Sequence, residues 1–117
     1  MKYFKINEFD SPDAIGSGEN MDKEFLSRLD QARLIADTPF KITSGFRTPK
    51  HNAKVGGVPN SSHIIGHAAD IACTDSVSRY RIITSLLKAG FNRIGIADSF
   101  IHVDNDPDKA TGVIWTY

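Results

Sequence analysis

The sequence SSHIIGHAADIAC at residues 61–73 contains an abrupt change of pattern, because a polar loop gives way there to a compact apolar run. From Ala68 to Cys73 the side chains are small or apolar except for Asp70, and such a short apolar run is typical of a buried strand. Burying a lone carboxylate costs roughly several kcal/mol unless a cation or a metal ion compensates it. The stretch therefore predicts a buried strand whose single acid meets a positive partner.

Helical and strand-like patterns extend outward from this strand on both sides. Apolar residues at helical spacing predict two long helices, one at residues 21–36 with Asn20 as its cap and one at residues 76–90. A short helix is predicted at residues 49–55 and an irregular segment at residues 1–20. Strand patterns occur at residues 40–44, 68–73, 93–97, 100–104 and 113–117, of which the last three predict an antiparallel meander.

Length and composition limit the classes of protein to which the chain can belong. Its 117 residues suit one domain, and 14 basic against 14 acidic residues, with no block of like charge, give no support for nucleic-acid binding. No apolar run approaches the ~20 residues that span a bilayer. The N-terminus lacks the apolar region of a signal peptide, so we expect synthesis in the cytoplasm, and the lone Cys73 cannot form an internal disulfide.

A second polar feature lies in the strand pattern FIHVD at residues 100–104. Strand alternation places His102 and Asp104 on one face and the apolar residues between them on the other. Two histidines and one aspartate, here His63, Asp70 and His102, are the ligand types of a catalytic zinc site that leaves its fourth position to water. Taken singly, each has a structural explanation: His63 as a polar loop residue, Asp70 as a turn cap and His102 as a core histidine. One shared ion explains all three more economically.

Three motifs together resemble the zinc D-Ala-D-Ala carboxypeptidase family of metallopeptidases, which includes phage L-alanyl-D-glutamate endopeptidases. They are S-x-H-x-x-G-x-A-x-D at residues 61–70, FIHVD at 100–104 and S-G-F-R-T-P-x-H-N at 44–52. The resemblance implies a single domain over residues 1–117 with the α+β hedgehog/DD-peptidase fold, a small antiparallel sheet packed with two main helices. It also implies one zinc ion per chain and peptidoglycan stem peptides as substrates. The metal ligands implied are His63, Asp70 and His102.

The same resemblance implies a substrate-binding role for Arg47, and Ser61 is a further candidate. A guanidinium forms two parallel hydrogen bonds to a carboxylate, so Arg47 suits a substrate carboxylate or the scissile carbonyl. The alternative is a structural arginine that pairs with Asp70 or a loop carbonyl. No base is evidently paired with Ser61, so its hydroxyl is expected to bind loop backbone or a ligand and not to act as a nucleophile.

The proton acceptor is the point at which the sequence departs from the family pattern. Many members have an acid three residues before the last histidine ligand, where this chain has Ser99. Asp104, on the face of His102, is the favoured general base, and Asp98 is the other candidate if residues 97–99 turn. Either carboxylate has the alternative role of orienting a ligand imidazole.

Three functional hypotheses follow from the sequence. The first is a zinc peptidase that acts on the cell wall, released in the manner of a phage lytic enzyme, as the missing signal and family analogy suggest. The second is a zinc-stabilised, catalytically inactive wall-binding domain, which the absence of an acid at Ser99 favours. The third is a metal-free α+β module. The sequence predicts neither the bond that is cleaved nor the oligomeric state.

Overall fold

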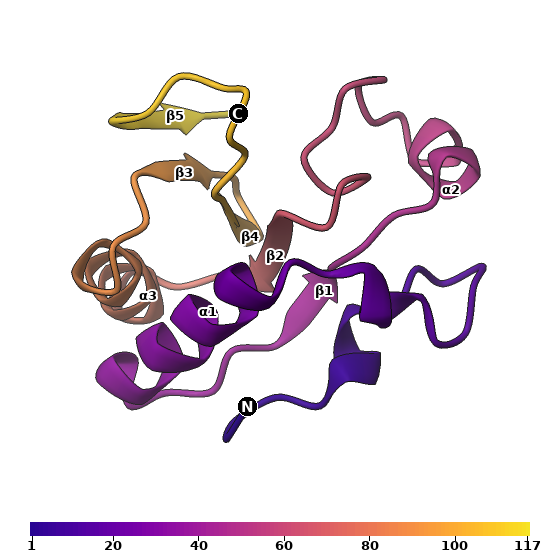
Figure 1. Cartoon of the computed structure of the whole chain (residues 1–117). Coiled ribbons are helices and arrows are strands. Elements are labelled where there is room, and N and C mark those ends of the chain that lie inside the picture. Colours follow the sequence, from indigo (N-terminus) through magenta and orange to yellow (C-terminus); the bar gives the residue numbers. More distant parts are fainter.

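Five short strands form one sheet in the computed structural model, which describes all 117 residues (Figure 1). Two single-turn 3₁₀ helices, at Ile6–Phe9 and Ser17–Asn20, lie in the irregular N-terminal segment that the sequence predicts. The remaining elements are α1 (Lys23–Ala36), β1 (Ile42–Ser44), α2 (Pro49–Lys54), β2 (Ala68–Ala72), α3 (Ser76–Lys88), β3 (Arg93–Ile96), β4 (Phe100–Asp104) and β5 (Val113–Thr116). No helix has both the length and the apolar character that crossing a membrane requires.

Side-chain caps define where the helices begin. Asp22 accepts a hydrogen bond from the backbone N–H of Phe25 at the start of α1, and Asp75 does the same for Ser78 in α3. The prediction that Asn20 caps α1 is wrong. The Asn20 amide instead donates to the Ser17 carbonyl, so it closes the preceding turn.

The sheet has the strand order β1-β2-β4-β3-β5 and is mixed. Three pairings are antiparallel, but β5 runs parallel to β3, so the predicted antiparallel meander is wrong for the last strand. The physical reason is that β2 and β3 occupy both edges of β4, so β5 cannot pair with β4 and instead pairs with the outer edge of β3. Residues 105–112 carry the chain back to the start of β3, where the Asn92 carbonyl accepts from Gly112 and Val113.

The hydrophobic core lies between one face of the sheet and the helices α1 and α3, which pack against each other (Figure 1). Alternation along β4 sends Ile101 and Val103 into this core, where both are fully buried, as the sequence predicts. Cys73 also lies in the core. These observations confirm an α+β fold with two main helices, and they leave the opposite face of the sheet to polar residues.

Candidate metal centre

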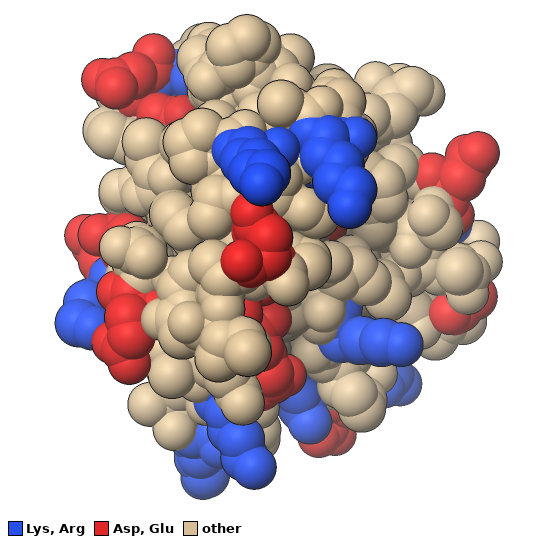
Figure 2. Space-filling model, turned by 90° about the vertical axis from the view of Figure 1, so that its right-hand side faces the viewer, with Lys and Arg blue, Asp and Glu red and all other residues tan.

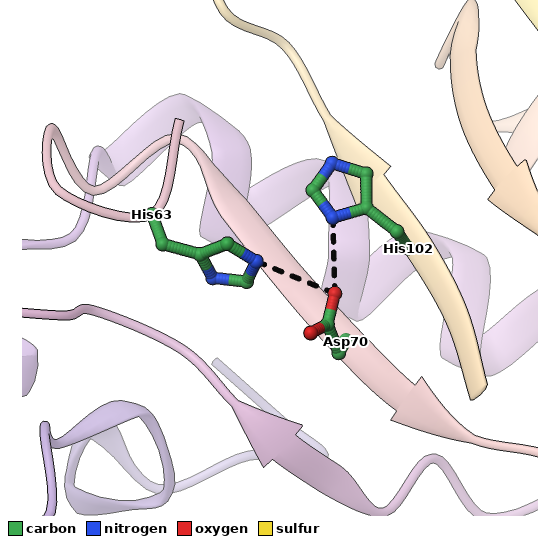
Figure 3. Close-up of side chains that lie close together, drawn as sticks. All are labelled: His63, Asp70 and His102. Carbon is green, nitrogen blue, oxygen red and sulfur yellow. Dashed lines mark hydrogen bonds and ion pairs between the residues drawn. The ribbon is translucent and has the colours of Figure 1, made fainter. Parts of the chain in front are cut away.

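Three buried side chains converge on the polar face of the sheet (Figure 3). Asp70 on β2 and His102 on β4 are direct cross-strand partners, while His63 reaches them from the loop before β2. One carboxylate oxygen, Asp70 Oδ1, lies 3.3 Å from His63 Nε2 and 3.0 Å from His102 Nδ1. The structure therefore brings together the three residues that the sequence indicates as metal ligands.

Hydrogen bonds on the outer side of each imidazole fix which nitrogen faces the centre. His63 Nδ1 lies 2.8 Å from the Gly45 carbonyl, and His102 Nε2 lies 2.7 Å from Asp104 Oδ2. Since a carbonyl and an ionised carboxylate only accept, both outer nitrogens donate. In neutral imidazoles, the inner nitrogens then carry lone pairs directed at a carboxylate oxygen. Three converging acceptors require a proton or a metal ion between them.

The donor set and its spacing fit zinc. The three ligand atoms lie within 4.8 Å of one another. Zinc bonds to histidine nitrogen and carboxylate oxygen are about 2.0–2.2 Å long, so two ligands of a tetrahedral ion are separated by about 3.3 Å. Calcium and magnesium prefer a shell made of oxygens. His63, Asp70 and His102 are thus the residues that would hold the ion.

The electrostatics of the centre favour ionised groups despite their burial. Burial alone would raise the pKa of the Asp70 carboxyl, but hydrogen bonds with His102 and His63 outweigh it and hold that pKa well below its usual value. Burial alone would lower the pKa of His102, but its bonds to Asp104 and Asp70 raise it above the ordinary value. The hydrogen bonds between His102 and the two carboxylates thus offset the burial of these charged groups.

Arg47 and Ser61 lie beside this centre and line the same cleft, which has a volume of about 360 Å³. The Arg47 guanidinium donates to Ser44 Oγ, Asn52 Oδ1 and Asp70 Oδ2 at 3.0, 3.2 and 3.4 Å. The structural pairing with Asp70 is therefore present. Because a guanidinium has five N–H donors, two remain for another partner.

The Ser61 hydroxyl oxygen accepts from the backbone N–H of His63 at 3.2 Å. This contact is the loop-backbone interaction that the sequence analysis expects for Ser61. Its side chain is buried at the edge of the cleft, in the same loop as the candidate metal ligand His63. Ser61 thus helps to shape this loop.

The two carboxylates considered as proton acceptors are placed very differently. Asp104 lines the cleft but is only 1% exposed: Oδ1 accepts from Arg93 Nε at 2.6 Å, and Oδ2 from His102. Burial would raise the pKa of Asp104, but the hydrogen bonds from His102 and Arg93 lower it. Asp98 is exposed in the turn between β3 and β4 and is not among the residues that line the cleft. The structure thus brings Asp104, but not Asp98, to the candidate site.

The cleft also contains residues that the sequence analysis did not identify. They include Arg93, Lys109, Trp115 and Tyr117. Burial raises the pKa of the Tyr117 phenol, so this group remains a hydrogen-bond donor at neutral pH. Trp115 in β5 and Tyr117 just after this strand are two residues apart, a signal that they share a face, but the sequence does not indicate beside which strand that face lies.

Fold and site together define a small α+β domain that presents three candidate metal ligands at a cleft, the arrangement expected of a metal-dependent hydrolase. The chain belongs to the peptidase M15 family, whose model matches residues 2–104. It is also similar to the zinc D-Ala-D-Ala carboxypeptidase of Streptomyces albus G, with 46% identity over 37 residues. This alignment covers 32% of the chain and 14% of that enzyme. The predicted family is confirmed, and a zinc peptidase is supported as the general class.

Proposed function

We propose that the protein is a zinc peptidase that hydrolyses an amide bond in the stem peptide of peptidoglycan, as a D-Ala-D-Ala carboxypeptidase or an L-Ala-D-Glu endopeptidase, at the cell wall. The observation that carries the proposal is the convergence of His63, Asp70 and His102 beside Arg47 in one cleft. The similarity to a zinc D-Ala-D-Ala carboxypeptidase supports this substrate class.

The metal ligands are held in a fixed orientation by their outer hydrogen bonds. A zinc ion bound by them would polarise a carbonyl group and lower the pKa of a water molecule towards ~7. The Gly45 carbonyl and the Asp104 carboxylate keep the lone pairs of His63 Nε2 and His102 Nδ1 directed inward. Such pre-organisation avoids a reorganisation cost during the reaction.

Substrate binding is assigned to Arg47, assisted by Ser61 in the adjoining loop. The two N–H groups of Arg47 that have no partner suit a substrate carboxylate or the oxygen of the scissile carbonyl. On the face shown in Figure 2, basic and acidic side chains are interspersed among uncharged surface. This face therefore carries no broad surface of one charge, which supports recognition through the cleft.

Proton transfer distinguishes the peptidase from a second candidate function, a zinc-stabilised wall-binding domain. Asp104 and Asp70 are the carboxylates that line the cleft, and both oxygens of each have partners. We therefore assign Asp104 to orienting His102, the alternative role that the sequence analysis left open, and not to accepting the proton of water. The absence of a carboxylate oxygen without a partner in the cleft favours the binding domain as the second candidate.

Defined stem peptides test the proposal. Zinc-loaded protein is incubated with peptides that contain a D-Ala-D-Ala or an L-Ala-D-Glu bond, and the products are identified by mass spectrometry. We expect cleavage of one bond that stops after chelation and returns with zinc. Asp98→Asn serves as the matched control for Asp104→Asn, because Asp98 is exposed outside the cleft. Wall binding without any product would instead establish the second candidate.

A further inference from the structure

A single row of residues crosses all five strands on the polar face of the sheet. The strand registers pair Ser44 with Asp70, Asp70 with His102, His102 with Gly95, and Gly95 with Trp115. Cross-strand partners project on the same face. Trp115 therefore lies on the side of the metal centre, two strands away from His102.

Gly95 allows the indole of Trp115 to reach across the intervening strand. A Cβ atom at Gly95 would lie 2.7 Å from Trp115 Cε2 and Nε1, a distance that real Cβ atoms do not tolerate. Neighbouring strands are about 4.8 Å apart, so the backbones of residues on strands two positions apart are separated by about 10 Å. The rings of Trp115 and His102 are nevertheless only 5.5 Å apart, at an angle of 50°.

A closed circuit of contacts includes this ring pair. His102 Nε2 donates to Asp104 Oδ2, and Asp104 Oδ1 accepts from Arg93 Nε. The Arg93 guanidinium then lies over the Trp115 ring, 5.0 Å from its centre, and Trp115 contacts His102. We call these four residues the His102 support ring. Each member contacts two others, so the imidazole is held both at its outer nitrogen and on its ring.

We infer that Trp115 is a positioning residue for the metal site, which closes the His102 support ring and holds the His102 imidazole in its ligating orientation. The inference rests on the proposed metal site. Trp115 lies outside the residues 2–104 that the family model matches. Partners that orient metal-bound histidines typically change metal affinity by about 10–100-fold.

Metal binding by four variants tests the inference, with zinc competition against a chelator and the absorption spectrum of the Co²⁺ form as readouts. Trp115→Ala should raise the Kd for zinc by about tenfold and alter the Co²⁺ spectrum, and Trp115→Phe should restore both in large part. Ile114→Ala is the matched control, because Ile114 is the adjacent β5 residue, is 55% exposed and does not line the cleft. Gly95→Ala should weaken metal binding as Trp115→Ala does, because its methyl group displaces the indole.

Fluorescence gives an independent measurement, because Trp115 is the only tryptophan in the chain. Co²⁺ should quench its emission strongly in the wild-type protein and less in Gly95→Ala. Wild-type emission that Co²⁺ leaves unchanged would overturn the inference, whether or not the variants fold. So would folded Trp115→Ala and Gly95→Ala proteins with wild-type zinc affinity and Co²⁺ spectra. A wild-type protein that binds no zinc would refute the proposed function itself, so the two failures are distinguishable.

Discussion

The two faces of β4 are equally buried but chemically opposite. Ile101 and Val103 are 0% exposed on the helix-covered face, and His102 and Asp104 are 8% and 1% exposed on the cleft face. The first pair packs in the hydrophobic core. The second pair is held by directional hydrogen bonds, and no buried side-chain nitrogen or oxygen in the structure lacks a partner.

This difference determines how each face responds to substitution. Burial of apolar surface is non-directional, so a truncated core side chain loses packing without leaving an unpaired group. A buried polar group is tolerated only while its partners remain, since an unpaired one incurs its full desolvation cost. Changes on the helix-covered face should therefore affect folding stability alone, whereas changes on the cleft face should affect metal binding and, where they leave a buried partner unpaired, stability as well.

The largest effect is expected when a metal ligand is removed. Asp70→Ala should reduce zinc affinity and peptide cleavage by at least about 10³-fold, because it removes the only anionic ligand of the centre. Because the substitution also leaves Arg47, His63 and His102 without their carboxylate partner, it should lower stability as well, so binding is measured on variant protein that circular dichroism shows to be folded. Metal content and calorimetric titration measure the loss. One tightly bound zinc per chain in this variant would refute the assignment of the site.

The corresponding change on the other face is Ile101→Ala. Because Ile101 is fully buried among core residues, truncation should reduce the free energy of unfolding by about 2–5 kcal/mol. Zinc affinity of the folded variant should match that of the wild type. Urea unfolding in chelator and zinc titration at low temperature separate the two quantities. A Kd for zinc that changes as much as it does in cleft variants would show that the two faces are not independent.

Removal of zinc should destabilise the protein by an intermediate amount. Zinc at 100 times its Kd stabilises the folded state by about 2.7 kcal/mol, which corresponds to roughly 10 °C in Tm for a domain of this size. The shift should be absent in Asp70→Ala and retained in Ile101→Ala. Thermal unfolding with and without chelator provides the measurement. Equal Tm values for the wild type under both conditions would favour the metal-free module.

The helix-covered face was largely predictable from the sequence, and the cleft face only in part. Period-two alternation in FIHVD correctly separates the core residues Ile101 and Val103 from His102 and Asp104. Alternation is a local property, so one strand is enough to reveal it. The apolar surroundings of Asp70 likewise signal a charge that needs a partner.

Long-range features of the cleft were not predictable. The parallel pairing of β5 depends on which strand has a free edge. β4 has none because β2 and β3 pair with it, and β2 lies more than 40 residues before β5 in the chain. The arrival of Trp115 beside His102 follows from that pairing together with the lack of a side chain at Gly95. The hydrogen bond from Arg93 to Asp104 depends on the β3–β4 pairing in the same way. Because this bond occupies one oxygen of Asp104, it favours the role of orienting His102 over that of a free base.

The smallest expected effect concerns the edge of the cleft, where Asp106 holds the loop that carries His63. The buried Ser62 hydroxyl donates to Asp106 Oδ2 at 2.7 Å, and Lys109 Nζ lies 3.5 Å from the same oxygen. Burial raises the pKa of Asp106, but the hydrogen bond from Ser62, the backbone bond from Asp108 and the Lys109 charge outweigh it, so the pKa is lowered overall. Asp106→Asn should therefore cost about 1 kcal/mol of stability at neutral pH.

The pH dependence of this cost further distinguishes the two faces. Because the pKa of Asp106 is lower in the folded than in the unfolded state, its stabilisation is fully present above the unfolded value of about 3.9 and is lost as pH falls through the folded value. The difference in unfolding free energy between the wild type and Asp106→Asn should then shrink in acid. The exposed Asp108 provides the control variant Asp108→Asn. The stability cost of Ile101→Ala should stay constant over the same pH range, since no titrating group is removed. A pH-independent cost for Asp106→Asn would show that the hydrogen bonds of Asp106, and not its charge, hold the loop.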